Sequence, residues 1–233
     1  MAIALVQTAT QVQVDASSAT SFNITITGTA NGNALTACHS VYDAALFSIS
    51  SVSDSGNSWT TRTGTASSGS DRTDGVLSHA ANITGGSRTI TIALSGTSGG
   101  SNRYITYGAQ EWSGVATSAY EDTWDDNSEV DITSADVTAG PITTTDAGDV
   151  LVGIATANIS LAMSYGSPTS WTNSYREDDG SLHATYDVAY WLPGSIQTTY
   201  SPQWSHTNSA TKGTAVVVAL KPAGGISVAW FTA

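Results

Sequence analysis

The residues best suited to bind a metal ion form an acidic stretch at positions 121–131, which reads Glu-Asp-Thr-Trp-Asp-Asp-Asn-Ser-Glu-Val-Asp. Carboxylate and amide oxygens are the ligands that Ca²⁺ prefers. The candidate ligands are Asp122, Asp125, Asp126 and Glu129. The spacing differs from an EF-hand loop, and no glycine supplies that loop's sharp turn. We therefore interpret the stretch as a solvated surface loop, with a Ca²⁺ site as the alternative.

No group of residues predicts catalysis. Residues 96–100, Gly-Thr-Ser-Gly-Gly, satisfy the G-x-S-x-G pattern of a nucleophile elbow. That motif needs a helix after the serine, and here another strand is expected. The four histidines, at positions 39, 79, 183 and 206, lack metal-ligand spacing. We predict that the protein is not an enzyme and needs no cofactor.

The segments that would position these residues occur twice in the sequence, as an internal repeat. Residues 14–35 match residues 130–151 without a gap, so that Asn33 aligns with Asp149 at an offset of 116. Later the offset shortens slightly, as at Trp59 and Trp171, because loops absorb deletions at little cost. We expect residues shared by both copies to serve the fold. Residues found in one copy are candidates for function.

Some tryptophans are shared by both copies, and others occur in only one. Trp59 and Trp171 occupy matching positions and are predicted to lie in the core. Three others, Trp124, Trp191 and Trp204, have no aromatic counterpart in the other copy. Large aromatic rings anchor protein interfaces and present flat apolar faces. These three residues are therefore candidates for a ligand or interface surface, with local packing as the alternative. His79 and His183 are expected on corresponding strands, which indicates a structural role.

Short segments with a period of two indicate strands. Residues 23–27 and 88–92 alternate polar with apolar, whereas residues 216–220 are continuously apolar, as in a strand covered on both faces. Strands are expected near residues 3–14, 22–29, 33–43, 47–54, 58–64, 75–83, 88–96 and 103–113, and again from about 129. The predicted class is all-β, with two β-sandwich repeats of jelly-roll or immunoglobulin-like type at residues 1–117 and 118–223. We favour two closely packed lobes over one merged sandwich.

The composition of the chain disfavours some classes of binding partner. The net charge is −12, and only seven residues are basic, which disfavours a nucleic-acid surface and docking on an anionic membrane. Cys38 is the single cysteine, so no internal disulfide can form, and a small buried residue is expected there. The first residues lack the basic and apolar regions of a secretory signal. We expect a protein made in the cytoplasm.

The segment at residues 224–233 has no counterpart in the first copy. Two glycines precede a strand-like run that carries Ile226, Val228, Trp230 and Phe231. Left in water, such a run would invite aggregation, so we expect it to be buried. It could add a strand to its own sandwich or reach a neighbouring subunit. We interpret these four side chains as partner-binding residues.

Turn and strand motifs at residues 32–35, 52–60, 85–92, 111–115 and 219–223 resemble a Gly/Ser/Thr-rich group of β-sandwich proteins. Members of this group occur in the virions of tailed bacteriophages and on bacterial surfaces. The resemblance covers roughly residues 20–223 and implies a fold, with no catalytic residues to assign. It implies a virion structural protein, such as a capsid decoration or cement protein, that contacts other virion proteins and forms homo-oligomers. The alternative is a carbohydrate-binding module or adhesin.

Overall fold

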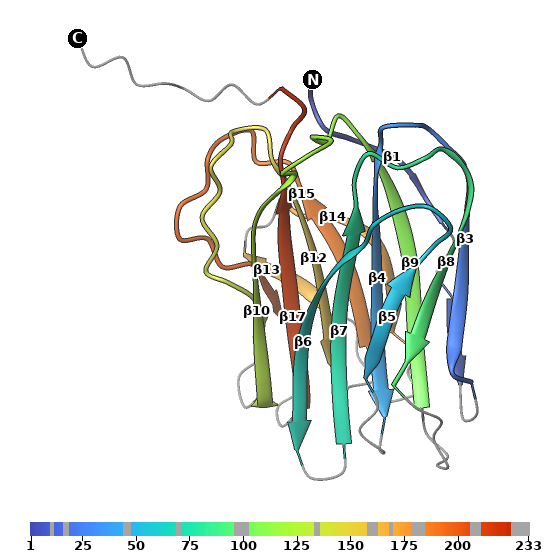
Figure 1. The fold of residues 1–233 in the computed structure, drawn as a ribbon. Coiled ribbons are helices and arrows are strands. Elements are labelled where there is room, and N and C mark those ends of the chain that lie inside the picture. Colours follow the sequence, from blue (N-terminus) through green and yellow to red (C-terminus); the bar gives the residue numbers. More distant parts are fainter. Residues whose placement is uncertain are drawn as a thin grey trace.

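A computed structural model describes residues 1–9, 12–15, 19–43, 48–68, 71–95, 103–132, 136–157, 163–167, 170–178, 185–205 and 211–224. These residues form antiparallel strands and no α-helix (Figure 1), which confirms the all-β prediction. A helix that could span a membrane is accordingly not found among them.

The first copy builds one large and one small sheet. The large sheet has the order β1-β9-β4-β7-β6, and β2 pairs with β9 beside β1. Its strands are β1 (Ala4–Thr8), β2 (Val12–Asp15), β4 (Ala34–Asp43), β6 (Thr60–Ser68), β7 (Asp71–Ala80) and β9 (Arg103–Ser113). The small sheet has the order β3-β8-β5, from β3 (Ser21–Thr29), β5 (Ile49–Ser53) and β8 (Gly86–Leu94).

The second copy repeats this plan. Its large sheet has the order β10-β17-β12-β15-β14, from β10 (Glu121–Ile132), β12 (Val150–Ala157), β14 (Thr172–Asp178), β15 (Thr185–Trp191) and β17 (Thr211–Leu220). Its small sheet has the order β11-β16-β13, from β11 (Asp136–Thr138), β13 (Ser164–Ser167) and β16 (Gln203–Ser205). Each strand of the second copy answers to one of the first, except that β10 answers to β1 and β2 together.

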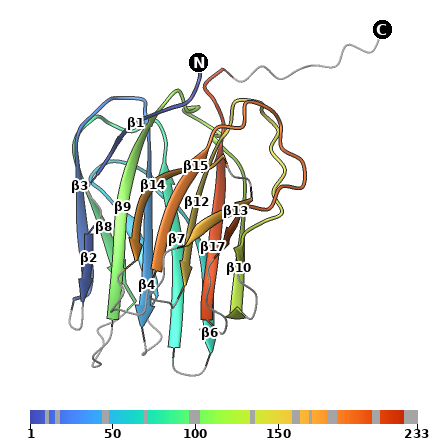
Figure 2. The same ribbon diagram turned by 180° about the vertical axis from the view of Figure 1, so that it is seen from behind.

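The two large sheets pack against each other, and a small sheet covers each of them from outside. One apolar core lies between each small sheet and its large sheet, and a third lies between the two large sheets. The long strands run along a common direction in both views (Figures 1 and 2). The two sandwiches are therefore stacked and share a central core.

An approximate two-fold axis relates the copies. Ser40 and Thr156 are matched residues at the offset of 116, and their hydroxyl oxygens lie 3.0 Å apart. A contact between matched residues of two copies is what a two-fold axis produces. The axis therefore passes close to this pair, between β4 and β12.

Layer position explains the two sequence patterns. β3 lies in an outer layer, and its side chains alternate between exposed and buried. β12 lies in an inner layer, and all of its residues are buried. The continuously apolar run of residues 216–220 is also fully buried, which confirms the prediction of a strand covered on both faces.

The acidic stretch is a strand, and its interpretation as a loop was wrong. Residues 121–132 form β10, which pairs with β17 at the edge of the second large sheet. The second copy therefore begins its strands at Glu121, earlier than expected. Its carboxylates suit an edge position, because charged side chains discourage pairing with the edge of another molecule.

Candidate functional site

The unmatched tryptophans differ in exposure. Trp204 is fully buried with its ring centroid 5.7 Å from that of Trp171, so its assignment to a ligand surface was wrong. Trp191 packs on Tyr200, at 5.2 Å between centroids. Only Trp124 is exposed among these candidates, at 37%. Trp171 lies in the core as predicted, and Trp59 is partly buried against the first core.

The histidines are structural where the structure describes them. His39 is buried beside the first core, and burial lowers its pKa to about 3, so the ring is neutral at pH 7. His79 pairs with Thr36 in the first large sheet, and the matched position in the second copy is Tyr190, opposite Val152. The expected match of His79 with His183 was therefore wrong. His183 and His206 lie outside the described residues.

An ion-pair cluster joins the two copies at one flank of the central core. Arg62 of β6 donates two hydrogen bonds to Glu121 of β10, at 3.0 Å from Nε and 2.5 Å from Nη2. Nε2 of the buried His79 lies 2.7 Å from the same carboxylate. Burial alone would raise the pKa of Glu121, but bonds and charge from His79 and Arg62 outweigh it and lower the pKa to about 2.

This cluster is poorly suited to proton transfer. A carboxyl group with a pKa near 2 stays ionised at neutral pH and donates no proton. Both of its oxygens already accept hydrogen bonds from Arg62 or His79. The geometry instead ties the edge strand β10 to β6 and β7. The Arg62 guanidinium also lies 4.5 Å from the ring centroid of Trp124, which it helps to position.

A second polar cluster lies inside the second copy. Asp187 of β15 is fully buried and accepts hydrogen bonds from Arg176 Nε at 2.5 Å and Tyr165 Oη at 2.9 Å. Burial raises its pKa more than these partners lower it. The matched residue in the first copy is Val76. Val76 pairs with His39, and Asp187 pairs with Ala155, which is the residue matched to His39. The unduplicated carboxylate is thus satisfied by neighbours that fasten β13 and β14 to β15.

A third cluster surrounds Asp149, just before β12. In the first copy Asn33 donates to the buried Glu111 at 2.7 Å. The matched residues of the second copy are Asp149 and Ala219, so this partner is missing. Both carboxyl oxygens of Asp149 are buried without a hydrogen-bond partner among the described residues, and the nearby Asp122 acts on the group through its charge. Burial, with the charges of Asp122 and Asp146, raises the pKa of Asp149 to about 8, so it is protonated at neutral pH.

Lys221 lies close to two carboxylates of this cluster. Lys221 Nζ lies 3.0 Å from Asp122 and 3.5 Å from Asp146. Of the proposed Ca²⁺ ligands, Asp122 is engaged there, and Asp125 accepts a hydrogen bond from the backbone of Asp126. No group of three ligand-type side chains suited to a metal ion occurs in the described part of the chain. The side chain of Glu129 lies outside it.

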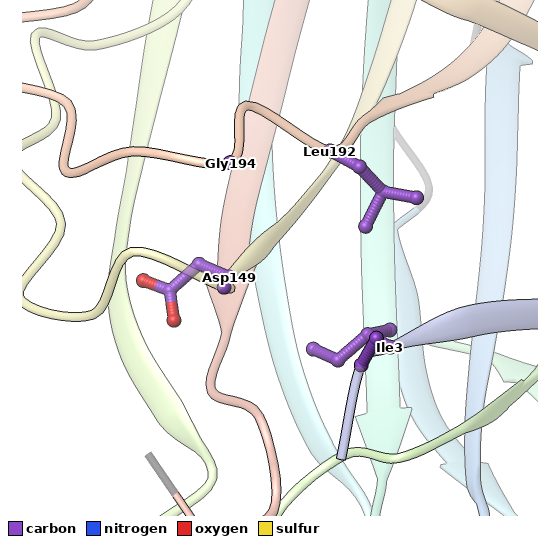
Figure 3. A pocket seen from close by; sticks show the side chains of 6 residues that line it. Ile3, Asp149, Leu192 and Gly194 are labelled. Carbon is purple, nitrogen blue, oxygen red and sulfur yellow. The ribbon is translucent and has the colours of Figure 1, made fainter. Parts of the chain in front are cut away.

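A small pocket opens beside this cluster, at the end of the molecule that carries Met1. It has a volume of about 230 Å³ and is lined by Ala2, Ile3, Gly148, Asp149, Leu192 and Gly194. The carboxyl group of Asp149 points away from Ile3 and Leu192 (Figure 3), so the side chains that face the opening are apolar. This pocket brings together the N-terminal residues, the turn before β12 and the segment after β15.

Comparisons with protein-family models, curated proteins and solved structures found no match to this chain. The resemblance to virion proteins therefore remains a hypothesis drawn from its turn and strand motifs.

Sequence reasoning missed the residues that form the pocket and the cluster beside it. Leu192, Asp149 and Lys221 were not singled out as site residues. A signal was available for Asp149, because the internal match replaces the Asn33–Glu111 pair with aspartate and alanine. No comparable signal marks Leu192, whose role depends on where the segment after β15 lies.

Proposed function

We propose that this chain is a non-enzymatic structural protein of a bacteriophage virion, most simply a decoration or head-surface protein. The observation that carries the proposal is the apolar end of the molecule. Met1, Leu192 and Ile196 are exposed large apolar residues, and they lie in or near the segments that line the pocket. Exposed large apolar side chains at one end of a molecule are candidates for an interaction site.

The interior supports a passive role. The buried carboxylates of Glu111 and Asp187 are held by hydrogen bonds within the fold, and Glu121 is paired with Arg62. These groups fasten strands to each other. Three stacked cores joined by such contacts make a stiff body, which suits a protein that reinforces an assembled shell.

Charge favours contact through the apolar end. A net charge of −12 makes like copies repel along acidic faces such as β10. The last 12 residues, 222–233, carry no charged side chain. In this proposal the apolar segment that carries Ile226, Val228, Trp230 and Phe231, which lies outside the described residues, contacts a neighbouring virion protein.

The test uses particles from the natural source, separated on a density gradient. The full chain is expected to sediment with assembled particles. A version lacking residues 224–233 should remain folded by circular dichroism but stay at the top of the gradient. The double variant Leu192→Asp/Ile196→Asp, which alters exposed residues only, should behave like the truncation. A full chain that never sediments with particles would overturn the proposal.

One observation favours a second candidate, a carbohydrate-binding role. Trp124 is exposed beside Arg62 and close to Glu121, and an open ring next to charged groups can hold a sugar. Trp204 no longer supports this role, because it is buried. A glycan array with the purified chain and with Trp124→Ala separates the two functions. Specific binding that disappears in the variant would favour the carbohydrate role.

A further inference from the structure

The pocket at the apolar end is the right size for one large side chain. Its volume of about 230 Å³ lies below the roughly 300–1,000 Å³ of pockets that hold small-molecule ligands. The side chains that face it, Ile3 and Leu192, are apolar, and the Asp149 carboxyl group points away from them (Figure 3). An apolar side chain from a protein segment is therefore a better occupant than a polar ligand.

The chain itself leaves the fold beside this pocket. Ala223 donates to the carbonyl oxygen of Gly114 at 2.6 Å and accepts a hydrogen bond from the Met1 amine at 2.8 Å. Pro222 lies against Gly148, since a Cβ added there would be 3.1 Å from the proline ring. Residue 223 is thus held next to two of the segments that line the pocket.

The backbone turns at this point. Ala223 and Gly224 form a turn, and Gly224 has a φ of +73°, in the region that glycine adopts without strain. A second glycine, Gly225, follows. A turn here ends the direction of β17 at residue 224.

We propose that residues 225–233 dock on the pocket of their own chain, with one large apolar side chain filling it. The segment, which lies outside the described residues, carries Ile226, Val228, Trp230 and Phe231 and no charged side chain. Nine residues can reach up to about 30 Å, so the pocket is well within range. Attachment beside the pocket gives an effective concentration of the order of mM, which favours the chain's own segment over that of a second copy.

Docking would enlarge the apolar end rather than remove it. The pocket holds one large side chain, and the remaining apolar side chains of the segment would extend the surface around Leu192 and Ile196. This inference concerns the free chain and does not depend on the virion role.

Disulfide trapping tests the contact in the purified full chain. Leu192→Cys is combined with Ile226→Cys or with Trp230→Cys, and the control pair joins Trp230→Cys to Thr25→Cys on the exposed face of β3. The native Cys38 is fully buried and will not compete. At least one pocket pair should form an intramolecular disulfide about tenfold more than the control pair. Disulfide-linked dimers alone, or no excess over the control, would overturn the proposal.

Hydrogen exchange gives a second readout that needs no cross-link. Leu192→Asp places a charge at the mouth of the pocket on a side chain that is 43% exposed, so the fold should tolerate it. The amides of residues 225–233 should then exchange about tenfold faster than in the native chain, because the docked state is lost. Val6→Asp, at an exposed apolar residue on β1, is the matched control. Equal exchange in the native chain and Leu192→Asp would contradict docking.

Discussion

The two flanks of the central core are packed by different residues at matched positions. At the flank formed by β6, β7, β10 and β17, glycines allow close approach: a Cβ on Gly75 would lie 3.3 Å from a methyl group of Thr214. At the opposite flank the residue matched to Gly75 is Tyr186, whose hydroxyl donates to the carbonyl oxygen of Cys38 at 2.5 Å. Tyr175, packed on Gly108, stands where the first flank has Arg62.

The edge strands of the two large sheets also carry different side chains at matched positions. Glu121 and His79 form a charged contact at the first flank, and the matched residues at the second are Leu5 and Tyr190. Tyr190 there packs edge-on against Trp112, with centroids 5.1 Å apart. The two copies therefore keep the same strand order, but different types of side chain pack at the two flanks. One flank depends on charge and the other on aromatic volume.

The largest expected effect is on the aromatic flank. Tyr186→Ala removes a fully buried ring and leaves a cavity, and it should lower the free energy of unfolding by about 3–5 kcal/mol. The matched change on the glycine flank, Gly75→Ala, adds one methyl group and should cost about 1–3 kcal/mol. Urea denaturation of the two variants measures both. Equal effects would show that the flanks are packed alike.

The second-largest effect on stability is expected at the charged flank. Glu121→Gln removes the charge that faces Arg62 and His79 and should lower the free energy of unfolding by about 2 kcal/mol. Asp125→Asn, on the same strand but outside the cluster, is the control and should change it by less than about 0.5 kcal/mol. Thermal melting follows both variants. A neutral Glu121→Gln would mean that the cluster adds nothing to the joint between copies.

The pH dependence of stability should separate the charged flank from the pocket end. The pKa of Glu121 is lowered from 4.5 to about 2, so its contribution is full above pH 4.5 and is lost as the pH falls through 2. The pKa of Asp149 is raised from 3.8 to about 8, so its contribution is full below pH 3.8 and is lost as the pH rises through 8.

Melting temperatures across this range test both directions. Glu121→Gln should flatten the profile below pH 4.5, and Asp149→Asn should flatten the decline between pH 3.8 and 8. The native profile must fall on both sides for the two assignments to hold. An Asp149→Asn variant that still loses stability between pH 3.8 and 8 like the native chain would contradict the raised pKa.

The smallest expected effect concerns the exposed ring on the charged flank. Trp124→Ala removes the stacking of Arg62 and should cost about 0.5–1 kcal/mol. The change should be additive with Asp125→Asn but not with Arg62→Ala, because the ring and the guanidinium interact. A double-mutant cycle measured by urea denaturation decides this. A cost well above 2 kcal/mol would place Trp124 in the core.

Much of the fold could be predicted from the sequence because it depends on local pattern. The alternation in β3 and the apolar run in β17 follow from which faces of a strand are covered, and the matched Trp59 and Trp171 marked the repeat. The acidic strand β10 was missed, because its residues have low strand propensity and only pairing with β17 keeps them extended. The burial of Trp204 was missed for a similar reason, since it depends on the distant Trp171.

By itself, the sequence determined the class of the fold, its duplication and its acidic surface, since composition and period-two patterning act within a few residues. Only the tertiary structure decided how the copies meet. It placed Ser40 against Thr156 at the two-fold axis, paired Glu121 with Arg62, and left Asp149 beside an apolar pocket. These contacts join residues far apart in the chain, and their energies depend on burial and distance, which arise only when both copies have packed.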